Sequence, residues 1–440
     1  MKTSSNFPGR KNLFPPFSRI GPYFRSDANR RNFWLGVTNG VLYAGAEAFT
    51  DPSVVLTYFT SLLTDSKFLV GLVAPIRIGG WFLPQLLVSG FVQRQERKLR
   101  LYSRLGVPRA LSWGLMVLVL WFVTDPGVLL ALFFMFLVVY SLAEGLAGLS
   151  FMDVVGKVIP LHRRGAFFGA RRLLGGILAL AASVVVGWAL SERAGLAFPH
   201  NFALLFGLSF VLISLALYAF ARIDEPVEPV RHAHVSVPAQ LRRARHLPRQ
   251  NPTYGRFLSA RLLMVIADMA VPFYVVFAKE SLGAAPGLVG VYLATTTLSG
   301  LLANLWAARA SDRHGNRQLL VVACFVGLSS PALALLFDWW RGPAFLFALA
   351  FAMNGVYNTA AWVAHTNFLL EIAPPGDRPI YVGTANTLVG MAILASSGGG
   401  ALVDWLGFGA LFALALAALL LATGVAVSIR EPREGQSASF

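Results

Sequence analysis

The chain of 440 residues has few charged residues and a single cysteine. Only 13% of the residues are charged, about half of the roughly 25% found in soluble domains, so a water-soluble globular protein is excluded. The single cysteine, Cys324, lies inside an apolar run, which excludes a disulfide and a Cys-based metal site. No Walker-type glycine loop occurs, and the polar segments hold no nucleophile, base and acid arrangement. We therefore expect that the protein is not an enzyme and has no catalytic residue, metal or cofactor. The energy source that we expect is a proton gradient.

Long apolar runs are what the sequence has instead, and 56% of its residues are hydrophobic. Crossing about 30 Å of hydrocarbon takes roughly 20 helical residues, and twelve stretches reach that length. They are 33–62, 68–92, 106–124, 127–155, 165–190, 200–222, 257–278, 288–308, 318–337, 343–370, 380–402 and 408–428. The sequence predicts an all-α integral membrane protein with 12 transmembrane helices.

A polar, proline- and arginine-rich insert divides these spans six and six. We expect two six-helix bundles and three polar segments. The expected units are an N-terminal tail (1–32), a first bundle (33–222), a linker (223–256), a second bundle (257–428) and a C-terminal tail (429–440).

The net charge of +16 is distributed unevenly along the chain. Of the 37 Lys and Arg residues, 32 fall in the tails and in alternate loops, and this bias places those segments, with both termini, in the cytoplasm. The expected location is the plasma (cell inner) membrane, with an uncleaved first span. Membrane lipids and a small-molecule substrate are the expected partners, nucleic acid is not, and the monomer should be functional.

The two halves repeat each other in parallel. Three residues of the second span match three of the eighth at an offset of 219: Gly71, Gln85 and Arg94 with Gly290, Asn304 and Arg313. After the fourth span the offset is 214: Pro160, Arg164 and Gly169 match Pro374, Arg378 and Gly383. Such internal repeats are typical of membrane transporters.

A charged loop motif marks both halves. In the second half it comprises Asp312, Arg313, Gly315, Asn316 and Arg317, and in the first half Gly90, Arg94, Arg97 and Lys98, with Gln93 in place of the aspartate. These loops, the span count and the linker resemble the major facilitator superfamily. The resemblance implies a secondary transporter in which two bundles rock, and in which the loop stabilises the outward-open state. The family's antiporter signature, Gly-x-x-x-Gly-Pro in the fifth span, is missing from 165–190.

Ionisable residues inside a span cost roughly 2.5–3.5 kcal/mol or more, so each needs a reason. In the first span four polar residues share one helix face at a four-residue spacing: Asn39, Tyr43, Glu47 and Asp51. The second span has Arg77, Trp81 and Gln85 at the same spacing. Asp51 and Arg77 both lie on the order of 15–18 Å deep, so we expect them to pair, as a fixed ion pair or as a gate. Asp51-Pro52 should also kink the first span.

Two further carboxylates, Glu47 and Glu144, lie at similar depth without an obvious basic partner. They are the candidates for reversible protonation, because burial favours the neutral form of a carboxyl. A structural carboxyl and a site for a cationic substrate remain alternatives. Asp268 is a further buried acid, with Arg261 as its expected partner.

The second half has neutral residues at the corresponding places. Asn358 corresponds to Glu144, Asn354 to Tyr140, Thr296 to Arg77 and Asn304 to Gln85, with Trp362 and His365 close by. We expect these residues to line a substrate cavity near the membrane midplane together with Asn39, Tyr43, Trp81, Gln85 and Tyr140.

The sequence favours proton-coupled export of an amphipathic or cationic compound by rocker-switch alternating access. Uptake of a neutral polar solute, such as a sugar, is the alternative. A sensor or a lipid-scrambling protein on the same fold is the alternative from another class.

Overall fold

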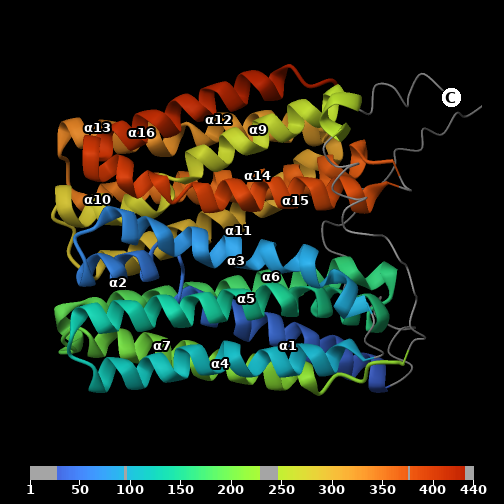
Figure 1. Cartoon of the computed structure of the whole chain (residues 1–440), viewed down its shortest axis with the longest axis horizontal. Helices are drawn as coiled ribbons and strands as arrows, with labels where there is room; N and C mark the ends of the chain where they lie inside the picture. The colour runs from blue at the N-terminus through green and yellow to red at the C-terminus, as the bar shows by residue number, and fades with distance from the viewer. Residues whose placement is uncertain (1–26, 94–96, 228–245, 375–376, 432–440) are drawn as a thin grey trace, which may run out of the picture.

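The computed structural model describes residues 27–93, 97–227, 246–374 and 377–431, with side chains left out for 27–28, 83–93 and 379. All regular structure in these ranges is helical (Figure 1). The first half contains α1 (Asp27–Phe49), α2 (Val55–Leu63), α3 (Lys67–Gln93), α4 (Lys98–Phe122), α5 (Pro126–Val158), α6 (Leu161–Leu190), η3 (Glu192–Ala194) and α7 (His200–Ala221). The second half contains α9 (Pro252–Asp268), α10 (Val271–Ser281), α11 (Leu288–His314), α12 (Asn316–Gly327), α13 (Ser329–Trp340), η4 (Ala344–Phe347), α14 (Ala348–Ile372), α15 (Arg378–Ala395) and α16 (Gly398–Val427).

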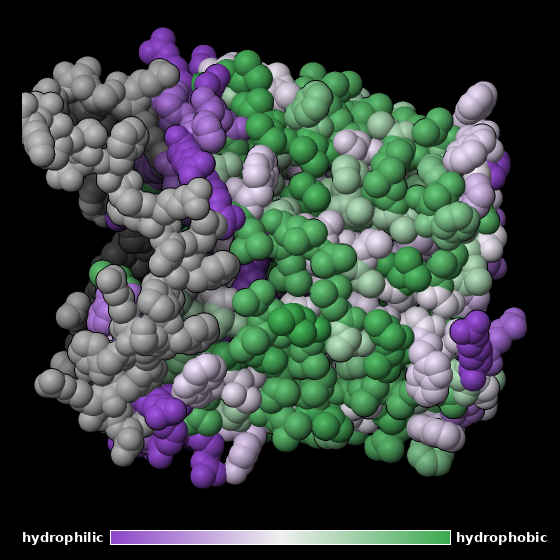
Figure 2. All heavy atoms as spheres, turned by 180° about the vertical axis from the view of Figure 1, so that it is seen from behind, coloured by the Kyte–Doolittle hydropathy of each residue, from purple (hydrophilic) through white to green (hydrophobic). Residues whose placement is uncertain are grey.

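Nine helical segments of the described ranges are long and apolar enough to cross a membrane. Figure 2 shows the same property on one surface, where a broad apolar belt lies between polar side chains at the two ends of the molecule. The protein is therefore a multi-pass membrane protein.

Several expected spans are interrupted: 257–278 divides between α9 and α10, and 318–337 divides between α12 and α13. The kink predicted at Asp51-Pro52 is confirmed. The first span, 33–62, is interrupted there, where α1 has ended and α2 has not begun. Proline has no N–H to donate, and the Asp51 carboxylate accepts hydrogen bonds from the N–H groups of Ser53 and Val54 (3.0 and 2.8 Å). At the other end of the chain α16 begins at Gly398 rather than 408, and Gly407, with φ +81°, interrupts it.

Helices of each half pack mainly on one another. In the first half α1 packs on α6 and α7, and α5 packs on α3 and α4; in the second half α14 packs on α11 and α12, and α16 packs on α9. The halves meet where α6 contacts α11 and where α3 contacts α15 and α16. Figure 1 shows the first-half helices in the lower part of the view and the second-half helices above them.

The closest helix crossing of the first half recurs in the second half. A Cβ on Gly145 of α5 would lie 2.6 Å from the Trp81 carbonyl oxygen of α3. The residues at the repeat offsets, Thr359 of α14 and Gly300 of α11, also lie at a close crossing, where a Cβ on Gly300 would lie 3.0 Å from the Thr359 hydroxyl. Small residues permit such close approach of membrane helices. The match supports the two offsets read from the sequence.

One end of the molecule is closed by contacts between the halves, which we call the rim. Lys67 at the start of α3 pairs with Glu280 of α10 (2.6 Å), and Lys279 donates to the Ser61 carbonyl (2.5 Å). Asp404 of α16 accepts hydrogen bonds from the N–H groups of Lys67 and Phe68, both at 3.2 Å, and so caps α3 across the interface. Beside them Gly71 and Gly400 bring α3 and α16 into backbone contact.

The loop motif of the second half lies at the opposite end of α11 from the rim. Asp312 and Arg313 belong to the last turn of α11, and Gly315, with φ +85°, ends it. Arg317 donates to the Val427 carbonyl at the end of α16 (2.8 Å). The charged loop motif is therefore a tight turn at Gly315 between two helices, with Asp312, Arg313 and Arg317 in the helix ends.

The glycine crossing gives a stability prediction. Gly145→Ala should lower the thermal unfolding midpoint of the purified protein, because overpacking against α3 costs about 1–3 kcal/mol. Gly424→Ala in α16 is the control, because no atom of another helix and no side chain lies within 4 Å of its Cβ position. Alanine also stabilises a helix by about 1 kcal/mol relative to glycine. A midpoint for Gly145→Ala as high as that of the control would contradict the prediction.

Candidate functional site

The close crossing of α3 and α5 brings Arg77 and Glu144 together. Besides the Gly145 contact, a Cβ on Gly80 would lie 2.7 Å from the Ser141 side chain. Arg77 lies one turn before Gly80 on α3, and Glu144 precedes Gly145 on α5. Their side chains therefore meet within the apolar belt.

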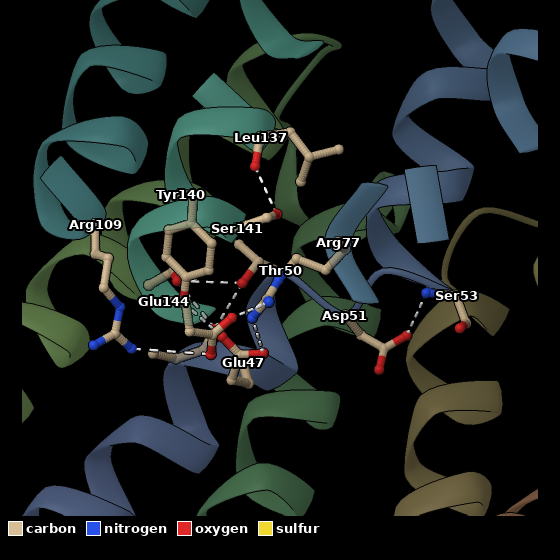
Figure 3. Close-up of polar contacts among 12 residues, drawn as sticks. Glu47, Thr50, Asp51, Ser53, Arg77, Arg109, Leu137, Tyr140, Ser141 and Glu144 are labelled. Atoms are coloured by element: carbon tan, nitrogen blue, oxygen red, sulfur yellow. Dashed lines mark hydrogen bonds and ion pairs between the residues drawn. The ribbon is translucent and has the colours of Figure 1, made fainter. Parts of the chain in front are cut away.

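Arg77 binds two carboxylates from different helices (Figure 3). Its Nη2 contacts Oε2 of Glu47 at 2.6 Å, and its Nη1 donates to Oε2 of Glu144. The Arg77 side chain is only 7% exposed, against 27% for Glu47 and 12% for Glu144. One guanidinium between two carboxylates leaves an excess of one negative charge.

Tyr140 and Arg109 complete this arrangement, which we call the charge cluster (Glu47, Arg77, Arg109, Tyr140 and Glu144). The Tyr140 hydroxyl donates to Oε1 of Glu47 (2.7 Å), and its ring lies 4.6 Å from the Arg77 guanidinium carbon. Arg109 of α4 is 3% exposed, and its Nη2 lies 3.9 Å from Oε1 of Glu144. With Arg109 included, two cations face two anions in the cluster.

The expected pairing of Asp51 with Arg77 is wrong. Asp51 points away from the cluster, toward the backbone of Ser53 (Figure 3). Its carboxylate accepts the N–H groups that the break after α1 leaves unpaired, while Arg77 turns to Glu47 and Glu144. The view that these two carboxylates lack a basic partner is wrong for the same reason.

Two cavities adjoin at Trp81. The larger, about 370 Å³, lies between the halves, and α3, α9 and α14 supply most of its lining. Its polar and aromatic lining includes Trp81, Arg261, Asp268, Tyr357, Asn358 and Trp362. The smaller, about 250 Å³, lies within the first half and is lined by Asn39, Tyr43, Trp81, Tyr102, Arg109, Glu144 and Arg171, among others. The larger cavity lies within the range of roughly 300–1,000 Å³ typical of small-molecule sites, and the smaller one lies just below it.

The second-half residues fall into two groups. Asn358 and Trp362 line the larger cavity, whereas Asn354 is buried and accepts a hydrogen bond from Asn358 (3.2 Å). Thr296 donates to the Tyr292 and Phe351 carbonyls and lines a separate, shallower pocket. Asn304 is half-buried in α11 and lines neither of the two adjoining cavities.

His365 does not line the cavities, contrary to the sequence prediction. It is buried, and its Nε2 lies 3.3 Å from the Met264 sulfur. Asp268 accepts a hydrogen bond from the Tyr357 hydroxyl (3.0 Å), and among the described residues it has no ion pair within 4 Å with Arg261. Tyr357 of a neighbouring helix thus supplies the hydrogen bond to this acid, and Arg261 lines the same cavity.

Three expected residues cannot be placed. The side chain of Gln85 and the surroundings of Gly90 lie outside the described part of α3, and Arg94 lies outside the described residues.

In the ranges that the structure describes, no group of three His, Cys, Asp or Glu side chains could hold a metal ion.

Two arginines of the site were missed at the sequence level. Arg109 and Arg171 were counted among the basic loop residues, because the apolar runs begin near them. In the structure α4 begins at Lys98 and α6 at Leu161, so both arginines lie more than two turns inside a helix. Arg171 donates to the Gly36 carbonyl and to Oδ1 of Asn39 (3.0 Å). The length of the continuous helix, rather than the hydropathy of its apolar run, would have placed both arginines inside the helices.

The fold and the family can now be compared with known proteins. A crystal structure of a D-xylose-proton symporter superposes with a TM-score of 0.72 at 15% identity, covering 92% of this chain and 99% of that one. The nucleoside transporter NupG gives 0.62 at 18% identity, over 92% and 98%. The family model of the Major Facilitator Superfamily matches residues 256–439. The second half of the chain is therefore similar to the major facilitator superfamily, and the fold of the whole chain is that of these transporters.

Two curated proteins with similar sequences come from Escherichia coli (strain K12). Sugar efflux transporter A is 28% identical over 113 residues, or 26% of this chain and 28% of the relative. Sugar efflux transporter C is 29% identical over 109 residues, or 24% and 27%. The matches thus span just over a quarter of the length of each relative.

Removing the central cation should destabilise the fold of this chain. Arg77→Met leaves Glu47 and Glu144 buried without it, which typically costs about 3–5 kcal/mol. The triple variant Glu47→Gln/Arg77→Met/Glu144→Gln should recover most of that loss. Denaturant unfolding in detergent measures both, with the exposed Arg104→Met of α4 as the control. Equal stability of Arg77→Met and the control would show that the cluster does not act in this way.

Proposed function

We propose that the chain is a secondary active transporter that moves a small organic solute by alternating access. Two six-helix bundles, 33–222 and 257–428, would rock about the larger cavity, joined by the linker 223–256. The contacts of α3 with α15 and α16 and of α6 with α11 support an interface of this kind, and so does the repeated glycine crossing. The tails, 1–32 and 429–440, would lie with the linker in the cytoplasm, with a functional monomer in the plasma (cell inner) membrane.

Proton coupling is proposed for the charge cluster. Glu47 and Glu144 share Arg77, so the second negative charge is held mainly by the more distant Arg109. Protonation of either carboxyl leaves the other one paired with Arg77. A group that accepts and releases one proton without losing its central ion pair suits a coupling site. This arrangement is the observation that carries the proposal.

We propose export as the direction of transport and a neutral polar solute as the substrate. The two sugar efflux relatives support export and a sugar-like solute. Both carboxylates of the cluster have an arginine neighbour, which disfavours the amphipathic cation expected from the sequence. Asp268, between Trp81, Tyr357 and Trp362 in the larger cavity, is the acid that would suit a cation, and it keeps that substrate class as the second candidate.

Transport into proteoliposomes tests this function. With an acidic interior, exchange for protons should accumulate a radiolabelled sugar (xylose, glucose or lactose) in the lumen, several-fold above the level without a gradient. Glu47→Gln and Glu144→Gln should keep downhill exchange but lose the response to the gradient, because the coupling carboxyl is gone.

Glu192→Gln, an exposed glutamate of η3, is the matched control and should behave as the wild type. Sugar transport that ignores the gradient in the wild type would refute proton coupling. Accumulation of tetraethylammonium instead of any sugar, abolished by Asp268→Asn, would establish the second candidate.

A further inference from the structure

Arg109 and Glu144 face each other across a gap too wide for a hydrogen bond. Nη2 of Arg109 and Oε1 of Glu144 are 3.9 Å apart, whereas a charged N–H···O bond spans about 2.7–2.9 Å. Among the described residues, the Arg109 side chain makes no hydrogen bond, and its Nε is buried without a partner. A buried guanidinium in this state lacks bonds that water would otherwise supply.

The gap opens onto the smaller cavity. Arg109, Glu144 and Tyr43 all line it, and the Tyr43 hydroxyl is also buried without a hydrogen-bond partner among the described residues. The Arg109 guanidinium lies over the rings of Tyr43, Tyr102 and Tyr140 at 5.3–6.0 Å. The rings hold Arg109 in place without using its donors. The donors of Arg109, Oε1 of Glu144 and the hydroxyl of Tyr43 thus lie around the same cavity without hydrogen bonds among the described residues.

A hydroxyl group matches this gap. One oxygen can lie about 2.8 Å from both Nη2 of Arg109 and Oε1 of Glu144, accepting from the first and donating to the second. A carboxylate or phosphate could only accept, and it would face Glu144. An ammonium group could only donate, and it would face Arg109.

The charges next to the gap balance one another. The titratable residues that face Glu144 are Tyr43 and Glu47 (α1), Arg77 (α3), Tyr102 and Arg109 (α4), Tyr140 (α5) and Arg171 (α6). The two glutamates balance Arg77 and Arg109. Arg171 adds one positive charge, and its Nη1 donates to the Gly36 carbonyl and to Oδ1 of Asn39.

We infer that the smaller cavity is the hydroxyl-binding subsite of the transporter, in which a hydroxyl of a neutral, sugar-like solute bridges Arg109 and Glu144. Tyr43 binds a second hydroxyl, and the rest of the solute extends past Trp81 into the larger cavity. This inference rests on the proposed function, and it names the substrate class and the residues that select it.

The bridge makes the solute and the proton compete. A protonated Glu144 no longer offers a carboxylate acceptor to the hydroxyl, so the solute binds more weakly to the protonated protein. By linkage the bound solute weakens proton binding equally. Competition for one residue gives exchange of proton for solute, which agrees with export against an inward proton gradient.

Ligand-dependent thermal stability of the purified full chain tests the subsite. The probes are xylose, glucose, lactose, the monodeoxy analogues of glucose, and glucose 6-phosphate. At about pH 8 at least one neutral sugar should raise the unfolding midpoint, and its apparent Kd should weaken about tenfold at roughly pH 5.5. One deoxy analogue should lose about tenfold in affinity, because it lacks the bridging hydroxyl.

Variants separate the subsite from general effects. Arg109→Met should weaken sugar binding about tenfold, and Glu144→Gln should both weaken it and abolish its pH dependence. Arg104→Met, on the exposed side of α4, should leave affinity unchanged. The analogue and pH arms need only the wild type, so a variant that fails to fold does not remove the test.

Three results would overturn the inference: no stabilisation by any neutral sugar, equal affinity for every deoxy analogue, or tighter binding of glucose 6-phosphate than of glucose. Each leaves proton-driven transport of another solute standing. Conversely, pH-sensitive sugar binding without gradient-driven transport would refute the proposed function and retain the subsite.

Discussion

Neutralising an arginine inside an apolar belt is the constraint on which the rest of this structure depends. Arg77 is almost completely buried, and an unpaired charge there would cost several kcal/mol. Two carboxylates satisfy it, and each comes from a different helix, so α1, α3 and α5 must all approach one point. The small residues Gly80 and Gly145 permit that approach. The close helix crossing is therefore what allows Arg77 to pair with both carboxylates.

The sequence predicted the architecture better than the pairing. Offsets of 219 and 214 residues identified contacts that do recur, because a duplicated helix pair keeps its small residues at the crossing. Depth along a helix was also correct for Glu47 and Glu144. Depth does not show where a helix ends, however: α1 ends at Phe49, and Asp51 beyond that end accepts backbone N–H groups instead of pairing with Arg77. Arg109 was missed because hydropathy marks the apolar middle of a helix and not its end; α4 continues well beyond its apolar run.

The two halves share a crossing but not its chemistry. Where α5 presents Glu144 to α3, α14 presents Asn358 to the larger cavity. Where the first half has Arg77, the second has Thr296, whose hydroxyl is satisfied by backbone carbonyls. The ion pairs of the charge cluster thus lie in the first half, while the second half lines the larger cavity with Asn358 and Trp362 and with Arg261 and Asp268. A division of this kind lets the second half move against the first half without separating any of the ion pairs of the cluster.

The rim differs from the cluster in its access to water. The rim lies at a partly exposed end of the molecule, where Lys67 contacts Glu280 and the carboxylate of Asp404. Dissolved ions there screen the attraction between opposite charges over about 8–10 Å at physiological salt. The cluster is buried and screened much less. Ionic strength therefore acts on the closure of this end separately from events at Arg77. We therefore expect the closure of the rim to depend on salt concentration, whereas the ion pairs of the charge cluster should depend on it much less.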